Sequence, residues 1–374
     1  MSLGSIRFDE GPLGTGTLFS APREVIVARE AEEVPEALAA AQAAHEGGAW
    51  LAGFASYELG YALVEKLRRL MPECRALPLL CLGVFDRPEP AEALPAAGAV
   101  RLGPPVPGWD EAAYAAAFAR VADYIAAGDI YQANLTFPMT LAVAGQAADL
   151  YALLRESQPV RHGALIDLGG EEWLLSRSPE LFFRADADGR IETRPMKGTA
   201  RRGATPEEDA ALKAGLAASE KNRAENLMIV DLLRNDIGRI CRIGSVRVPE
   251  LFSVESYRTV HQMTSLVTGQ LARRVTLAEV FEALHPCGSI TGAPKIRAME
   301  IIAELEPAPR DAYCGAIGWV APDGAMQFSV GIRTLHMAGG AVRLGVGGGI
   351  VHDSTAEDEY REALLKARFL TDLV

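Results

Sequence analysis

A clear amphipathic pattern of apolar and polar residues lies at residues 110–127. The apolar residues that recur there at spacings of three and four are Tyr114, Phe118, Val121 and Ile125. This period places them on one face of an α-helix, so a helix that buries this face is predicted. Gly and Asp at 128–129 are expected to end it. A second, Ala-rich helix is predicted around residues 32–45.

Shorter apolar segments indicate strands and further helices. Strands are predicted at residues 164–168, 181–184, 190–195, 326–337 and 341–346. Helices are predicted near Leu150, Pro206, Glu220, Leu277 and Pro294, and a last helix is predicted to begin with a capping box at residues 354–357. The strands come in adjacent pairs as often as they alternate with helices. This order favours an α+β fold with antiparallel sheets over a doubly wound parallel sheet.

A Pro-, Ala- and Gly-rich stretch at residues 88–107 divides the chain into two parts. Residues 1–107 are expected to contribute strands to the same globular unit as the rest of the chain. Residues 108–374 are expected to form the catalytic domain.

Composition and charge narrow the classes of function. The chain has 374 residues and a net charge of −12, which argues against a nucleic-acid binder because phosphate neutralisation needs a basic stripe. The five cysteines are widely spaced and form no CxxC motif, so neither a disulfide framework nor a zinc site is indicated. No run of about 18 apolar residues is found, so no membrane span is expected. A cytoplasmic protein is predicted.

A glycine run at residues 345–349 is the most conspicuous loop candidate. A dinucleotide-binding fingerprint needs a βαβ unit and an acidic residue about twenty positions further on, which the remaining chain cannot supply. Two interpretations stay open, an ordinary Gly-rich turn and a nest of backbone N–H groups that binds an anion. The phosphate-binding P-loop is excluded at Lys197, because no glycine precedes this lysine.

Carboxylates and one lysine are candidates for chemistry. Glu225 lies in a predicted helix, and Glu359 and Glu362 lie three residues apart on the last helix, so the latter two share a face. Mg²⁺ takes one or two protein carboxylates besides water and substrate oxygens. Lys197 follows a strand-like segment between Pro and Gly. Each of these residues has a plain alternative as a solvated surface group, but a buried lysine with a free amine is a nucleophile.

Read together, the motifs resemble those of the chorismate-utilising enzymes, which include anthranilate, aminodeoxychorismate, isochorismate and salicylate synthases. The matching segments run in family order and lie at residues 128–136, 176–180, 195–199, 224–232, 234–236, 288–295, 332–334, 347–350 and 359–362. The resemblance covers about residues 110–374. It implies an anthranilate synthase component I-like fold, a two-part antiparallel β-sandwich with helices packed outside and the active site in the cleft between the sheets.

The same resemblance implies the residues of the site. Lys197, Glu180 and His261 are expected to be catalytic. Glu225 and Glu362 are expected to bind Mg²⁺, with Glu359 behind them. The expected substrate contacts are Gln132, Gly198, Thr199, Thr291, Gly292, Tyr313, Arg333, Gly347 and Gly348.

Two positions choose among the reactions of the family. Enzymes that add water to chorismate carry a lysine base where this chain has Gln132, and a glutamine cannot take a proton from water near neutral pH. Anthranilate synthases typically have alanine where this chain has Lys197, whereas aminodeoxychorismate synthases have lysine. We therefore expect amination of chorismate at C4, to 4-amino-4-deoxychorismate.

Three alternatives stay open beside this expectation. An anthranilate synthase large subunit would aminate at C2 and eliminate pyruvate, and Lys197 argues against it. A silent chorismate-binding homologue or a scaffold would leave the acid, the amine and the metal positions unexplained. No arrangement typical of a glutamine-hydrolysing domain is recognisable, so ammonia is expected from a separate glutamine amidotransferase subunit or from solution.

Overall fold

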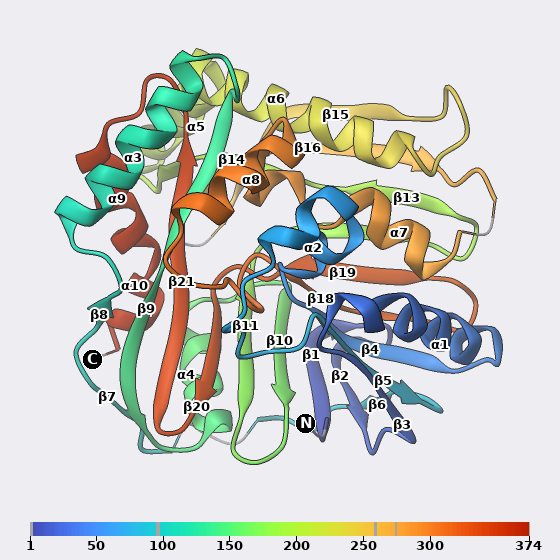
Figure 1. Ribbon diagram of the computed structural model, residues 1–374. Coiled ribbons are helices and arrows are strands. Elements are labelled where there is room, and N and C mark those ends of the chain that lie inside the picture. The colour runs from blue at the N-terminus through green and yellow to red at the C-terminus, as the bar shows by residue number, and fades with distance from the viewer. Residues whose placement is uncertain (1–2, 95–97, 258–259, 274, 374) are drawn as a thin grey trace.

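Two large antiparallel β-sheets organise the chain in the computed structural model (Figure 1), which describes residues 3–94, 98–257, 260–273 and 275–373. In sheet 1, neighbouring strands follow the order β17 (Gly292–Ala293), β9 (Gln132–Ala144), β21 (Ala341–Ile350), β20 (Thr334–Ala338), β11 (Trp173–Ser178), β10 (His162–Asp167), β1 (Ser5–Gly11), β2 (Gly14–Ser20) and β6 (Glu89–Pro90). The short strands β7 (Arg101–Leu102) and β8 (Val106–Pro107) also pair with β9.

Sheet 2 is built in the same antiparallel way. Its order is β14 (Met196–Arg201), β16 (Val260–Gln270), β13 (Arg190–Thr193), β12 (Leu181–Ala185), β19 (Met326–Val330), β18 (Ala316–Val320), β4 (Trp50–Ala55), β5 (Leu80–Phe85) and β3 (Glu24–Ala28). β15 (Arg247–Ser256) pairs with β16 outside this path. The expected α+β fold with antiparallel sheets is confirmed.

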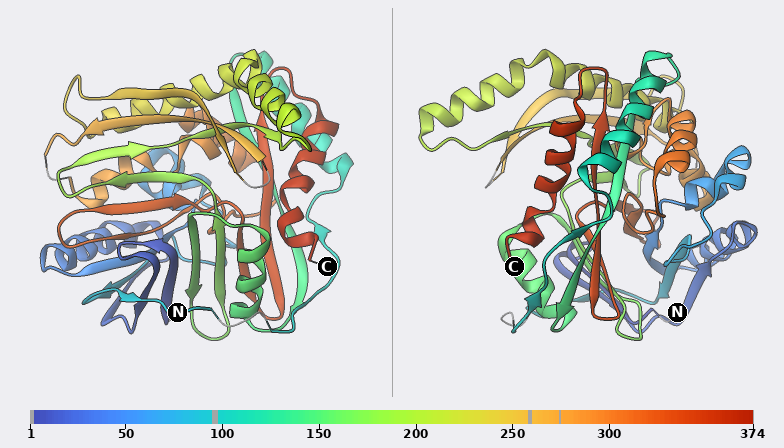
Figure 2. Two further views of the ribbon diagram at one scale, coloured as in Figure 1. Left: turned by 180° about the vertical axis from the view of Figure 1, so that it is seen from behind. Right: turned by 60° about the vertical axis from the view of Figure 1, so that its left-hand side comes forward.

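Helices pack against both sheets. Sheet 1 is covered by α3 (Glu111–Ala126), α4 (Ala147–Ser157), α9 (Ala356–Lys366) and α10 (Arg368–Thr371). Sheet 2 is covered by α1 (Val34–Glu46), α2 (Leu59–Leu63), α5 (Pro206–Ala218), α6 (Glu220–Gly238) and α7 (Leu277–Leu284). The remaining helical segments are α8 (Lys295–Leu305) and the 3₁₀ turns η1 (Ala31–Glu33), η2 (Glu65–Leu70) and η3 (Gly288–Ile290). Figure 2 shows α3 and α9 side by side along β9 and β21.

Three apolar clusters hold these layers together. One lies under α3, α4 and α9, and a second lies under α1, α6 and α7. The third joins the two sheets near the amino terminus, where Phe8 and Phe19 of sheet 1 meet Phe54 and Phe85 of sheet 2. The predicted face of α3 is buried as expected, through Tyr114 and Val121. Among the described helices, none has both the length and the apolar character that crossing a lipid bilayer requires.

Two of the places where the chain crosses between the sheets are neighbours. The chain leaves sheet 1 after β11 and enters sheet 2 at β12, and it returns from β19 to β20. Backbone hydrogen bonds tie the crossings to their neighbours: the Arg177 N–H donates to the Arg333 carbonyl over 2.9 Å, and the Val330 N–H donates to the Glu180 carbonyl over 3.1 Å. Both crossings carry residues that were predicted to belong to the site.

The single strand predicted at residues 326–337 is therefore wrong. It is two strands, β19 and β20, in different sheets, and the break falls where Arg333 adopts a left-handed φ of 50°. The apolar pattern continues through this break, because residues on both sides are buried by different neighbours. The last helix begins one residue later than predicted: Thr355 is its N-cap and accepts a hydrogen bond from the Asp358 N–H.

The glycine run at residues 345–349 is neither a turn nor a nest. It lies inside β21, which pairs with β9 from Ala341 to Ile350. Its glycines are required by close neighbours: a Cβ at Gly345 would lie 2.1 Å from the Tyr313 ring, and one at Gly347 would lie 2.2 Å from the Leu135 carbonyl oxygen. Both loop interpretations of this run are corrected.

Strands from residues 1–107 lie in both sheets, with β1, β2 and β6 in sheet 1 and β3, β4 and β5 in sheet 2. Residues 95–97 of the stretch that was taken as a division lie outside the described residues. The boundary at residue 107 stays a prediction.

Gly347→Ala is expected to destabilise the protein by about 1–3 kcal/mol, because the added Cβ forces the β9 backbone away. Gly215→Ala is the matched control: nothing lies within 4 Å of its Cβ in α5, so it should stabilise by about 0.5–1 kcal/mol. Urea unfolding of both variants measures this. Equal stability of Gly347→Ala and the wild type would contradict the close packing of β9 on β21.

Candidate active site

Glu180 lies at the crossing from β11 to β12, and its carboxylate is buried. Glu180 is only 5% exposed, and the Ser289 hydroxyl donates a 2.7 Å hydrogen bond to its Oε1. Burial raises the pKa of Glu180 to about 7, although the Ser289 hydrogen bond and the charges of Lys197 and Arg333 act in the opposite direction. A carboxyl group with such a pKa can hold a proton near neutral pH.

Lys197 lies on β14, beside a bulge in the pairing of β14 with β16. The next residue, Gly198, has a left-handed φ of 88°, which favours glycine. Desolvation lowers the pKa of Lys197, and the nearby Lys366 lowers it further, while Glu180, Glu225 and Glu362 raise it. Among the described residues, none forms a hydrogen bond or ion pair with the Lys197 ammonium. The amine is free to meet a ligand.

Arg333 lies at the return crossing, in a left-handed conformation that a non-glycine residue rarely adopts. Desolvation lowers the pKa of its guanidinium, and Glu180 opposes this shift. Within the described part of the chain, its guanidinium has no hydrogen bond or ion pair with a protein group. An unpaired cation withdrawn from water is a ready partner for the carboxylate of a ligand.

The substrate contacts predicted on β9 and β17 lie together. Gln132 is buried, its Nε2 lies 3.5 Å from Asn134 Oδ1, and its Oε1 has no partner. Gly292 pairs with Ala133, and a Cβ there would lie 2.2 Å from the Gln132 carbonyl oxygen. The Thr291 hydroxyl donates to the carbonyls of residues 287 and 288. Gln132 Oε1 is therefore a buried acceptor that has no partner among the described residues and is available to a ligand.

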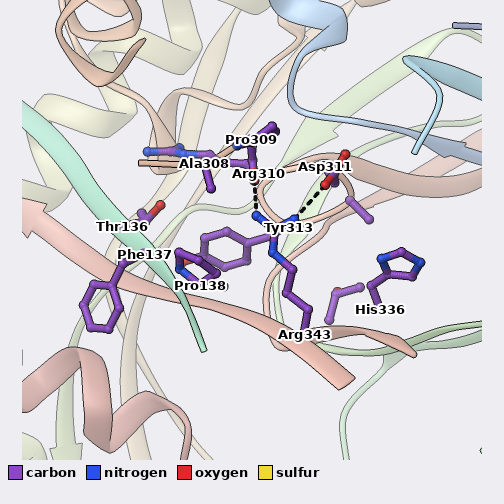
Figure 3. A pocket seen from close by; sticks show the side chains of 13 residues that line it. Thr136, Phe137, Pro138, Ala308, Pro309, Arg310, Asp311, Tyr313, His336 and Arg343 are labelled. Atoms are coloured by element: carbon purple, nitrogen blue, oxygen red, sulfur yellow. Dashed lines mark hydrogen bonds and ion pairs between the residues drawn. The ribbon is translucent and has the colours of Figure 1, made fainter. Parts of the chain in front are cut away.

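Tyr313 packs its ring against Gly345 of β21, and burial raises its pKa well above the usual range. Figure 3 shows the pocket around this ring, with Thr136 and Pro138 on one side and Arg343 and His336 on the other. The pocket has room of about 30 Å³ for water-sized molecules. This is room for one or two ordered waters, and Glu180, Lys197 and Arg333 are not among the residues that line the pocket.

Gly347 and Gly348 lie on β21 beyond Leu344, the last residue that pairs with β20. From Gly345 onward the strand pairs with β9 alone, so its other edge keeps backbone groups for further contacts. The Gly347 carbonyl accepts a 2.9 Å hydrogen bond from Lys366 Nζ. The use of the N–H groups by an anionic ligand stays a prediction.

Glu225, Glu359 and Glu362 gather beside this edge. Burial raises the pKa of Glu225 and of Glu359, and Glu362 adds to both shifts. Burial also opposes ionisation of Glu362, but the charge and hydrogen bond of Lys366, together with the charges of Lys197 and Lys221, outweigh it and lower the pKa of Glu362. The Ser354 hydroxyl donates to Glu359 Oε1 over 2.7 Å.

These glutamates fit Mg²⁺ only in an open form of site. In the described ranges, no three acidic, His or Cys side chains converge into a preassembled metal site. A cation nevertheless lies among them, since Lys366 Nζ is 2.8 Å from Glu362 Oε1, and a Cβ at Gly348 would be 3.0 Å from Glu359 Oε2 and 3.4 Å from Lys366 Nζ. Mg²⁺ needs only one or two protein carboxylates, so Glu225 and Glu362 suit it.

His261 lies apart from these groups. It is fully buried, its Nδ1 is 2.9 Å from Ser256 Oγ, and its Nε2 is 3.0 Å from Asp209 Oδ1. Asp209 also pairs with Arg202. Both ring nitrogens are thus engaged by protein groups, and these contacts give no support to a catalytic role. Thr199, next to this network, bonds Gln262 over 3.0 Å, and Gln262 Nε2 donates to the Gly198 carbonyl over 2.8 Å.

Two residues of the site were not singled out from the sequence. Ser289, inside the matched segment 288–295, donates a hydrogen bond to the Glu180 carboxylate. The two residues are 109 positions apart, so no local sequence pattern indicates this contact. Lys366 pairs with Glu362 from four residues further along α9. Its i,i+4 spacing from Glu362 was a signal that could have identified it.

The chain belongs to the family described as chorismate binding enzyme, which matches residues 89–372. It is 49% identical over 243 residues to the aminodeoxychorismate synthase of Streptomyces pristinaespiralis, covering 64% of this chain and 33% of the relative. It is 47% identical over 253 residues to aminodeoxychorismate synthase component 1 of Klebsiella aerogenes, covering 68% of this chain and 56% of the relative. The chain thus spans about a third to just over half of these relatives.

Relatives of a second kind match more of both chains at lower identity. The anthranilate synthase component 1 of Thermus thermophilus is 39% identical over 356 residues, covering 86% of this chain and 76% of the relative. Among solved structures, anthranilate synthase component I from Streptococcus pneumoniae superposes with a TM-score of 0.75 at 28% identity, covering 87% of this chain and 80% of that one. The anthranilate synthase component I-like fold is therefore confirmed.

Glu180→Gln is expected to change stability in a pH-dependent way. The folded chain binds the Glu180 proton with a pKa of about 7, above the ordinary value of 4.5, so rising pH through this window weakens folding of the wild type. The variant lacks this loss and should be more stable above pH 7, by about 3 kcal/mol at most. The difference should vanish below pH 4.5. Urea unfolding at pH 4.5, 6 and 8 measures this difference in stability. A difference that does not depend on pH would contradict the raised pKa of Glu180.

Proposed function

We propose that the chain aminates chorismate at C4 with ammonia, giving 4-amino-4-deoxychorismate and water. The observation that carries this proposal is a trio of buried groups: an acid, Glu180, and two basic side chains that have no partner among the described residues, Lys197 and Arg333. This arrangement offers a proton, a nucleophile and a carboxylate-binding group in one desolvated place. The names of the relatives that match at 49% and 47% identity support the same reaction.

Chorismate is a rigid dicarboxylate, and the site has groups for both ends. The Arg333 guanidinium suits one carboxylate by a bidentate contact. The free edge of β21 beside Gly347 and Gly348 is proposed to contact the other carboxylate through a backbone N–H. The other proposed contacts surround the ring and come from Gln132, Gly198, Thr199, Thr291, Gly292 and Tyr313.

The proposed reaction has two displacement steps. The Lys197 amine forms a bond to C2 while the two ring double bonds shift from C1–C2 and C5–C6 to C1–C6 and C4–C5. The C4–O bond breaks, and the Glu180 proton goes to the hydroxyl, which leaves as water. Ammonia then forms a bond to C4, the double bonds return to C1–C2 and C5–C6, and the C2–N bond to Lys197 breaks. The Glu180 carboxylate takes the proton from the new C4 ammonium, which restores both groups.

The protonation states that this sequence needs agree with the shifts at the site. An unperturbed lysine would cost about 4–5 kcal/mol to deprotonate at pH 7. Desolvation of Lys197 lowers that cost, and burial of Glu180 keeps a proton on it near neutral pH. A catalytic acid and nucleophile with pKa values moved toward each other suit a proton transfer at neutral pH.

Mg²⁺ is proposed to be held by Glu225 and Glu362, with Glu359 behind them. When bound, it would neutralise a substrate carboxylate and stabilise charge in the transition state. Lys366 would give up its contact with Glu362 to make room, because a single carboxylate oxygen cannot serve both cations closely.

Ammonia is proposed to come from a separate glutamine amidotransferase subunit. The support is the name of the Klebsiella relative, which calls it component 1 of its synthase. The second candidate function is that of an anthranilate synthase component, which the Thermus relative favours through its longer match. Lys197 argues against it, because the C4 reaction uses this amine and the C2 reaction has no need of it.

The direct test is to incubate the chain with chorismate, Mg²⁺ and excess ammonium salt at mildly alkaline pH and to identify the product by mass spectrometry and fluorescence. A species one mass unit below chorismate that an added lyase converts to 4-aminobenzoate is the expected result. Fluorescent anthranilate would identify the second candidate. Unchanged chorismate with an added amidotransferase as well as with ammonium would refute both.

Lys197→Ala should lose amination by a factor of 10² or more, because the nucleophile is removed while the binding groups stay. Lys213→Ala, an exposed position on α5, is the matched control and should keep the wild-type rate. Steady-state rates with ammonium as nitrogen donor measure both variants. Full activity of Lys197→Ala would remove the covalent step from the proposal.

A further inference from the structure

The loop that carries Tyr313 is held in an unfavourable backbone conformation. Asp311 and Cys314, on either side of it, have left-handed φ angles of 54° and 61°. Residues with a Cβ adopt this conformation at a cost in free energy, and they persist in it only where surrounding contacts over-determine the backbone. The loop therefore depends on groups outside it.

Arg310 supplies much of that constraint. Its Nη1 donates to the Ile290 carbonyl over 2.9 Å, and its Nη2 donates to the Asn134 carbonyl over 2.8 Å. Its own carbonyl accepts the Tyr313 N–H over 3.0 Å. One buried side chain thus joins three segments: the loop of Tyr313, the turn before Thr291 and the strand that begins at Gln132.

Glu306 and Glu58 hold Arg310 in turn. Glu306 forms a two-pronged ion pair with the guanidinium at 2.7 and 2.8 Å, and its Oε1 accepts hydrogen bonds from the Thr136 N–H and hydroxyl. The Glu58 carboxylate accepts the Arg310 N–H over 2.7 Å and the Asp311 N–H over 3.0 Å. The Tyr57 ring lies under the guanidinium, 4.4 Å from its carbon.

Packing alone does not account for this cluster. The Arg310 and Glu306 side chains are 2% and 5% exposed, and a buried ion pair often stabilises a fold no more than apolar residues of the same volume would. What apolar residues cannot do is fix direction. The planar guanidinium has donors at set angles, so it sets the relative positions of the carbonyls that it binds.

We propose that Arg310 is a positioning residue, which sets Tyr313 and Thr291 at the distances from each other that the substrate requires. The proposal rests on the proposed function for the identity of that substrate, chorismate. Arg310 does not touch the substrate itself. It acts through the loop of Tyr313 and through Ile290, and the N-terminal part of the chain takes part through Tyr57 and Glu58.

Double-mutant cycles test this. Arg310→Lys keeps the charge but loses the fork that reaches several carbonyls, and it is combined with Tyr313→Phe and, separately, with Thr291→Val. Arg177→Lys is the control, because Arg177 is a similarly buried arginine whose side chain binds Asp9, Tyr151 and the Gln158 carbonyl and none of the proposed substrate contacts. The kinetic parameters kcat and KM for chorismate are measured with Mg²⁺ and ammonium salt.

Arg310→Lys is expected to lower kcat/KM by roughly 10- to 100-fold, as misplacement of binding groups does, and Arg177→Lys by less than about 3-fold. In the Tyr313→Phe or the Thr291→Val background, the further loss from Arg310→Lys should shrink to less than about 3-fold. Equal losses from Arg310→Lys in all backgrounds, or a wild-type kcat/KM for the single variant, would overturn the proposal.

Two further measurements keep the outcome decisive. If Arg310→Lys does not fold, Glu306→Gln replaces it in the cycles, because glutamine keeps an acceptor for Thr136 but removes the ion pair. If the wild type does not turn over chorismate, the proposed function fails. The same cycles are then measured as dissociation constants for chorismate by calorimetry, with the same criteria for and against the role of Arg310.

Discussion

The withdrawal of three charged groups from water at one place is the constraint on which the candidate site depends. Glu180, Lys197 and Arg333 come from both sheet crossings and from β14, and burial penalises the charged form of each. Desolvation raises the pKa of the acid and lowers that of the two bases, so the same cause moves all three toward their neutral forms. A cleft that merely collected these residues at a wet surface would leave the lysine protonated and the glutamate ionised near neutral pH.

The fold meets this constraint through segments of backbone that approach one another closely. Sheet 1 and sheet 2 can exchange a chain at two adjacent crossings because Arg333 accepts a left-handed conformation there. β21 approaches β9 and Tyr313 closely because Gly345 and Gly347 have no side chains. Arg310 and Glu306 connect these walls from behind. The strained backbone in the loop of Tyr313 and the buried ion pair thus each cost folding free energy locally. Favourable contacts elsewhere in the fold offset this cost, and the site gains rigidity.

Much of the fold could be predicted from local pattern. The helix at 110–127 and the paired strands follow from periodicity alone, and the α+β class follows from their order. The glycine run was wrongly expected to be a loop, because its need for space arises from Tyr313 and Leu135, which are distant in sequence. The break at Arg333 was missed for a similar reason: its conformation is set by the crossing. Ordered motifs identified Glu180 and Lys197, but only the tertiary structure shows that Ser289 bonds Glu180 and that His261 is engaged by Asp209.

The central claim is that Lys197 is available as a free amine near neutral pH. The measurement that tests it most directly is an NMR titration of protein with ¹³C-labelled lysine side chains, assigned by the spectrum of Lys197→Ala. The account predicts that the Lys197 signal titrates at a pH well below that of the exposed lysines, because desolvation and the nearby Lys366 disfavour its charge. A Lys197 signal that titrates together with those of exposed lysines such as Lys213 would contradict the account.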